Sequence, residues 1–268
     1  MTKCSRAAAR SSKIRFSETM NLSIEGINLH FQVYGTGLPL LILHGWGDSG
    51  SNWYRVAQGL EAKFQVFLID LPGCGYSDPP PGVWGVEDYQ KLVESFIREM
   101  ELEDPIILGH SHGGKIAALH ASMHRPCKKL ILVSSSGLDR KSLQVRAKVY
   151  YFKFMKKLLN LCGAWGKNKL EELRGKLGSR DYREAGELRQ TMVKVVNQKL
   201  FSIVQSITVP TLILWGSEDK ILDLSQAKIF RRLISGSQIR VLWGATHHPH
   251  LEVPGEIAEL VSDFCVNG

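Results

Sequence analysis

The sequence lacks the features that would tie the chain to an oxidising compartment or to a membrane. Five cysteines occur in 268 residues, none of them in a C-x-x-C pair, and the odd number argues against a disulfide framework. No apolar run approaches the ~20 residues of a membrane span, and no apolar stretch follows the first charges as in a secretory signal. The composition, 44% hydrophobic and 22% charged, is typical of a globular protein, which we expect in the cytoplasm.

Acidic residues are scarce in two parts of the chain. The first fifteen residues hold five basic and no acidic residues, and residues 139–200 hold 16 basic and 6 acidic ones, although the whole chain carries only +8. For residues 1–19 we favour a disordered basic tail, with organelle targeting as the alternative. The basic segment has no helix-turn-helix, zinc-ligand or RNA-binding signature, so we expect no nucleic-acid partner.

Apolar runs alternate with helical patterns along most of the chain. Residues 22–33 predict a hairpin that turns at Glu25-Gly26, and six continuous apolar runs follow, at residues 40–43, 66–69, 106–108, 130–133, 211–215 and 239–242. Such runs indicate strands covered on both faces. Helical patterns lie between them, at residues 53–60, 87–100, 114–124, 225–234 and 254–264. We therefore predict an α/β fold with a doubly wound, mostly parallel, eight-stranded sheet.

One interval, residues 139–207, contains only helical and loop patterns. We predict a core of residues 20–138 and 201–268, with residues 139–200 inserted as a helical cap. Residues 148–165 mix aromatic side chains with Lys148, Lys153, Lys156 and Lys157, so the segment is amphipathic. We favour a cap over the substrate pocket; weak association with an anionic lipid surface is the alternative. The oligomeric state does not follow from the sequence.

Three of the predicted strands end in groups that can act together. Residues 106–108 lead into the stretch GHSHGG around Ser111, whose glycines indicate a tight turn that holds the serine out. Residues 211–215 lead to Asp219, and residues 239–242 lead to His247. The carboxyl ends of parallel strands meet at one edge of a sheet. The order serine, aspartate, histidine at these ends matches the nucleophile-elbow enzymes.

From about residue 21 onward, the sequence resembles the α/β-hydrolase fold superfamily, especially its serine esterases and lipases. The matching segments, in the family's order, are LILHGWGDSGSNW, VFLIDLPGCGYSD, GHSHGGKIA, PTLILWGSEDKI and GATHHPHLEVP. The resemblance implies that Ser111 is the nucleophile, Asp219 the acid and His247 the base of a catalytic triad. An ordinary serine N-cap of a helix is the competing interpretation of Ser111.

The resemblance also implies an oxyanion hole made by the main-chain N–H groups of Trp46 and His112. His44, Gly45 and Gly47 would support the loop that carries Trp46. The side chain of Trp46 fits a wall of the acyl pocket and a core tryptophan equally well.

Some assignments have nearby competitors. Glu218, Asp223 and Asp139 compete with Asp219 for the role of the acid, and His248 and His250 are alternatives to His247. The pattern of a base, one variable residue and then Pro-His selects His247, and leaves His250 a structural role.

Two H-x-H pairs suggest a metal, but adjacent residues of a turn point in different directions, so we expect no metal and no cofactor. The pairs are His110 with His112 and His248 with His250. The stretch GHSHGGKI also lacks the spacing of a phosphate-binding loop.

A serine at the turn favours acyl transfer over the epoxide and haloalkane hydrolysis that carboxylate nucleophiles perform in this fold. We predict a carboxylesterase-like enzyme that acts on a small-molecule ester, thioester or lactone through an acyl-enzyme. The alternatives are cleavage of a carbon–carbon bond in a diketone-like acid, and a slow-turnover ligand receptor that uses the same pocket.

Overall fold

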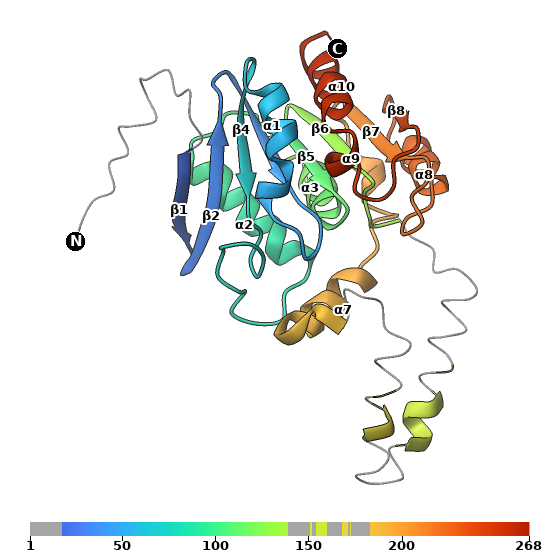
Figure 1. Cartoon of the computed structure of the whole chain (residues 1–268). Helices are drawn as coiled ribbons and strands as arrows, with labels where there is room; N and C mark the ends of the chain where they lie inside the picture. Colours follow the sequence, from blue (N-terminus) through green and yellow to red (C-terminus); the bar gives the residue numbers. More distant parts are fainter. Residues whose placement is uncertain are drawn as a thin grey trace, which may run out of the picture.

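The computed structural model describes residues 18–138, 151, 154–159, 168–170, 172 and 183–267. These residues form one eight-stranded sheet with helices on both faces (Figure 1). The spatial order of the strands is β1-β2-β4-β3-β5-β6-β7-β8. They comprise β1 (Glu18–Ile24), β2 (Ile27–Tyr34), β3 (Leu38–Leu43), β4 (Phe64–Ile69), β5 (Ile106–His110), β6 (Lys129–Val133), β7 (Thr211–Gly216) and β8 (Gln238–Leu242).

The direction of the strands matches the prediction. Strand β2 pairs antiparallel with β1 and β4, and all pairs from β4 to β8 are parallel. The predicted fold class, a mostly parallel eight-stranded α/β sheet, is therefore confirmed.

Successive side chains of the inner strands enter two separate core layers, because side chains alternate between the faces of a sheet. Leu41 and Leu43 pack in the layer of α2 (Val86–Glu99), α3 (His112–Ser122) and α8 (Ser225–Leu233). Leu40 and Ile42 pack in the layer of α1 (Tyr54–Leu60) and α10 (Pro254–Asn267) on the opposite face (Figure 1). Two covered faces explain why these strands are continuously apolar.

Strand β8 departs from that prediction. It lies at the edge of the sheet, and Gln238 and Arg240 are exposed, so one of the runs expected to be covered on both faces is covered only in part. Short turns of helix were also not predicted, since a single turn shows no period. They are η2 (Gly50–Trp53), η4 (Gly186–Leu188), η5 (Val204–Ser206) and α9 (Pro249–Glu252).

The described residues of the predicted cap are helical or loop. Residues 154–159 and 168–170 are helical, and α7 (Arg189–Asn197) lies at one end of the sheet, outside the two helical layers (Figure 1). Residues 1–17, 139–150 and Lys153 lie outside the described residues, so the basic tail and the cap boundary at residue 139 stay predictions. No helix in the described ranges has the length and apolarity that a membrane span requires.

A buried lysine joins α3 to the end of α7. Lys115 is only 1% exposed, and its Nζ donates hydrogen bonds to the carbonyl oxygens of Val195 at 2.8 Å and Gln198 at 3.1 Å. The last carbonyls of a helix have no partner within the helix, and a cation stabilises them. Lys115 thus anchors the end of α7 to the helix that follows Ser111.

We expect Lys115→Met to lower the free energy of unfolding by about 1–3 kcal/mol, because the carbonyls of Val195 and Gln198 lose the hydrogen bonds that the buried ammonium donates. Urea unfolding followed by circular dichroism measures this change. The matched control is Lys128→Met, at an exposed position away from α7, which should stay within about 0.5 kcal/mol of the wild type. Equal stability of the two variants would contradict the anchoring role.

Candidate active site

The turn between β5 and α3 holds Ser111 in a conformation that side chains rarely adopt. Its φ is 49° and its ψ is −107°. A Cβ on Gly109 would overlap the carbonyl of Gly113, and one on Gly113 would overlap the carbonyl of Leu43, so both positions require glycine. The Ser111 N–H donates to the Val133 carbonyl at 3.1 Å. The turn is therefore held by close backbone packing on both sides.

Ser111, His247 and Asp219 form one hydrogen-bonded chain. Nε2 of His247 lies 3.1 Å from Oγ of Ser111, and Nδ1 lies 2.8 Å from Oδ2 of Asp219. His247 and Asp219 are each 6% exposed, whereas Ser111 is half-buried. A hydroxyl open to substrate thus contacts an imidazole whose other nitrogen faces a buried carboxylate.

The loop after β7 fixes the carboxylate of Asp219. Its Oδ1 accepts hydrogen bonds from the N–H groups of Ile221 and Leu222, both at 2.8 Å, and this leaves Oδ2 for His247. The competing residues Glu218 and Asp223 are exposed. Asp223 instead accepts the N–H of Ser225 at the start of α8, and hydrogen bonds from this serine lower its pKa. Asp139 lies outside the described residues.

His110, directly before the serine, supports the loop of the imidazole. Its Nε2 donates to the carbonyl oxygen of His247 at 2.8 Å across 137 positions of sequence. Burial lowers the pKa of His110 well below its usual value, with further contributions from His250 and His247, so the ring is neutral. The residue before Ser111 therefore ties the strand end that carries the serine to the loop that carries His247.

His44, in the loop after β3, is held in one tautomer by its hydrogen bonds. Its Nδ1 donates to the carbonyl of Gly45 at 2.7 Å, and its Nε2 accepts the N–H of Leu71 at 2.9 Å. Its own carbonyl accepts the N–H of Gly113 at 3.1 Å. Burial lowers the pKa of His44, although the hydrogen bond to Gly45 opposes the shift. Gly47, with φ of 68°, permits the following turn.

Two main-chain donors lie free on either side of the serine. Among the described residues, the N–H groups of Trp46 and His112 donate no hydrogen bond. The two residues are close, because their rings meet edge-on with centroids 5.6 Å apart. The structure thus brings together the loop and the helix start that the sequence singled out.

The side chain of His112 lies among aromatic rings rather than with the other histidines. It meets Tyr89 edge-on at 4.9 Å, and both of its ring nitrogens are buried without a hydrogen bond. Burial, together with the nearby charge of Lys115, lowers the pKa of His112 to about 3. The ring is therefore neutral and lines the site beside the serine.

No described cysteine competes as nucleophile. Burial raises the pKa of Cys74 to about 11, that of Cys127 to about 12 and that of Cys265 to about 11. Only the thiolate is nucleophilic, so these thiols are inert near neutral pH.

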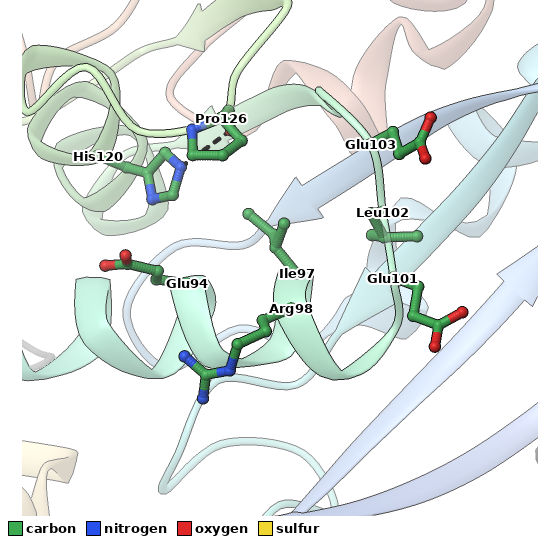
Figure 2. Close-up of a pocket in the computed structure, with 8 residues that line it drawn as sticks. All are labelled: Glu94, Ile97, Arg98, Glu101, Leu102, Glu103, His120 and Pro126. Carbon is green, nitrogen blue, oxygen red and sulfur yellow. Dashed lines mark hydrogen bonds between the residues drawn. The ribbon is translucent and has the colours of Figure 1, made fainter.

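Two further features lie outside the hydrogen-bonded chain. Within the described ranges, His110, His248 and His250 offer ring nitrogens within 4.8 Å of one another, the type of ligand that zinc or copper prefers. The pocket in Figure 2 is formed by residues of α2, the loop before β5 and the end of α3. This pocket lies at the opposite end of β5 from Ser111, so it belongs to no part of the site.

Three contributors to the site, Asp48, Trp53 and His110, were not predicted from the sequence. Trp53 stacks on His250 with ring centroids 4.3 Å apart and 6° between the planes, and His250 Nε2 lies 3.3 Å from Oδ2 of Asp48. His110 was considered only as half of an H-x-H pair. Asp48 and Trp53 lie in the segment LILHGWGDSGSNW, but no spacing or period in it indicates contacts with residue 250.

The similarity of the chain to known proteins agrees with this architecture. A family model described as the alpha/beta hydrolase fold matches residues 39–174. A pimeloyl-[acyl-carrier protein] methyl ester esterase of Vibrio parahaemolyticus is 27% identical over 88% of this chain and 98% of its own length. A monoacylglycerol lipase of Mus musculus is 27% identical over 84% of this chain and 74% of its own. The crystal structure of a bacterial membrane phospholipase A superposes with a TM-score of 0.77, at 24% identity, over 94% of this chain and 86% of that one.

The buried neutral ring of His112 makes stability depend on pH. The unfolded chain binds a proton at this residue below a pH of about 6.5, whereas the folded chain does not until about pH 3, so stability falls as the pH drops between these values. We expect His112→Met to reduce this slope by about 1.4 kcal/mol per pH unit between pH ~6 and ~4. Urea unfolding at several pH values measures it.

The control for this measurement is His124→Asn. His124 is exposed with φ of 54°, which asparagine tolerates, and its replacement should leave the slope as in the wild type. An unchanged slope in His112→Met would show that the folded protein protonates this ring.

Proposed function

Because the chain belongs to the alpha/beta hydrolase fold family, in which it matches esterases and lipases, we propose that it is a serine hydrolase. It cleaves a carboxylic ester through an acyl-enzyme on Ser111. The observation that carries the proposal is the hydrogen-bonded chain from Oγ of Ser111 through His247 to Asp219.

The first step of this reaction forms the acyl-enzyme. His247 Nε2 takes the proton of the Ser111 hydroxyl while Oγ attacks the carbonyl carbon of the ester. Asp219 keeps the proton of the neutral imidazole on Nδ1, so that Nε2 is free to act as base, and stabilises the imidazolium that forms. His247 then protonates the alcohol as it leaves. Water enters, His247 removes its proton, and hydrolysis of the acyl-enzyme restores Ser111.

The free N–H groups of Trp46 and His112 bind the negative oxygen of the tetrahedral intermediate. They suit this role because neither donates a hydrogen bond to another described residue and both lie on backbone held by neighbours. Gly113, next to His112, is tied to His44, which also fixes the loop of Trp46. Donors held in place before the reaction need no reorganisation during it, and one such donor contributes about 10²–10³ in kcat.

We expect Ser111→Ala to remove both the hydrolysis of short p-nitrophenyl esters and covalent labelling by fluorophosphonates. The kcat should fall by about 10⁴-fold or more, because only binding and the oxyanion donors remain. Turnover assays and mass spectrometry of the labelled protein measure the two effects. Ser51→Ala, at an exposed serine, is the matched control and should behave as the wild type.

Full ester turnover by a folded Ser111→Ala variant would exclude the serine mechanism. Labelling of Ser111 without turnover of any ester would point away from esterase activity. In that case a diketone-like acid and ligand binding would be measured next.

We expect Asp219→Asn to lower kcat by about 10⁴-fold with little change in KM, since the imidazole loses control of its tautomer. Steady-state kinetics on the same ester measure this. Asp223→Asn is the matched control, because Asp223 is an exposed carboxylate of the same loop, and it should change kcat by less than about twofold. Retained activity in Asp219→Asn would move the acid to another carboxylate, with Asp139 the first to replace.

A further inference from the structure

Three histidines gather on one side of the base, and their grouping differs from the two H-x-H pairs of the sequence. His110, His248 and His250 come together, with ring centroids 4.8 to 5.9 Å apart, whereas His112 lies with Trp46 and Tyr89. We propose that His110, His248 and His250 form a binding site for Zn²⁺ or a similar divalent transition ion beside the base, and that the bound ion inhibits the enzyme.

The two buried rings have unused nitrogens. Nδ1 of His110 and Nδ1 of His250 have no hydrogen-bond partner, and Nε2 of His250 has only the carboxylate of Asp48, at 3.3 Å. Both residues are at most 1% exposed, and a buried polar atom without a partner costs about 1–3 kcal/mol. A neutral imidazole nitrogen with a free lone pair is the ligand that Zn²⁺ takes most readily, and a bound ion would use the lone pairs that the fold leaves idle.

Each buried ring also has an oxygen near its other nitrogen, as metal-bound histidines usually do. Nε2 of His110 donates to the carbonyl of His247 at 2.8 Å, which leaves its Nδ1 for an ion. Nε2 of His250 lies 3.3 Å from Oδ2 of Asp48, and that oxygen is itself buried without a hydrogen bond. Oδ1 of Asp48 is already used by Ser49 and Asn52. Asp48 can therefore orient His250 once a ligand is bound.

The spacing of two of the three rings matches that around one tetrahedral ion. Ring nitrogens bind Zn²⁺ at about 2.0–2.1 Å, which places the centroids of two bound rings about 5 Å apart. His110 and His250 already stand 4.8 Å apart, and their positions are fixed by Trp53 and the surrounding core. His248 lies 5.7 and 5.9 Å from them. Because its side chain is exposed, it can move inward to complete the site and leave a fourth position for water.

A dication at this place would oppose catalysis. The His247 ring is 5.1 Å from that of His110 and 5.2 Å from that of His248. The proposed mechanism creates a positive charge on His247, and a nearby positive charge disfavours it. The inhibition rests on the proposed function, whereas the binding site does not.

The test uses the full chain, freed of metal by a chelator and carrying no histidine tag. Calorimetric titration with ZnCl₂ should show one ion per chain, and CoCl₂ should give the visible absorption of a tetrahedral site. His248→Asn should weaken Zn²⁺ binding by about tenfold to 100-fold or more. His124→Asn, the same change at an exposed histidine outside the site, should bind as the wild type. Absence of stoichiometric binding, or equal affinity of the two variants, would overturn the site.

Ester hydrolysis tests the inhibition separately. Saturating Zn²⁺ should lower kcat at least about tenfold in the wild type and in His124→Asn, with recovery on addition of EDTA. The rate of His248→Asn should be the same with and without Zn²⁺. Binding that depends on His248 without loss of turnover would overturn the inhibitory effect. If no ester is a substrate, the calorimetric result still decides whether the site exists.

Discussion

The whole site depends on one strained backbone position, Ser111. Its left-handed φ costs of order 1–3 kcal/mol and persists only because the surroundings enforce it. Gly109 and Gly113 lack a Cβ, so the backbone on both sides of Ser111 packs directly against neighbouring backbone. Hydrogen bonds of the Ser111 main chain to Val133 and Ser136 add to this restraint. This packing starts α3 directly after Ser111, so the same contacts place the hydroxyl of Ser111 and the free N–H of His112.

The other groups are placed by loops that follow different strands, and buried histidines join these loops. His44 joins the loop after β3 to the loop after β4 and to the start of α3. His110 joins the end of β5 to the loop after β8. Each link is a hydrogen bond inside the protein, where water does not compete for it. The distances from Ser111 to His247 and Asp219 are therefore set before any substrate arrives, as electrostatic catalysis requires.

The sequence predicted the sheet because its signals are local. Continuous apolar runs separated by helical patterns leave few alternatives to a doubly wound sheet, and three strand ends brought Ser111, Asp219 and His247 to one edge, although their catalytic roles stay predictions. The contacts of Lys115, or of His250 with Trp53, were beyond prediction. A lysine or tryptophan looks the same in sequence whether it is exposed or buried, and the distinction depends on segments 80 to 197 positions away.

The histidines around His247 matter through their charge. Burial lowers the pKa of His110, and burial together with His247 and His250 lowers that of His248, so both rings are neutral near pH 7. Because the neighbouring rings, about 5 Å away, are neutral, they do not oppose protonation of His247. The carboxylate of Asp219 then stabilises the positive charge on the protonated ring. Had these two rings kept ordinary pKa values, their partial protonation would repel the imidazolium at slightly acidic pH. A cation bound to this cluster would lie close enough to His247 to oppose its protonation, so the charge of the cluster bears directly on the base role that we propose for His247.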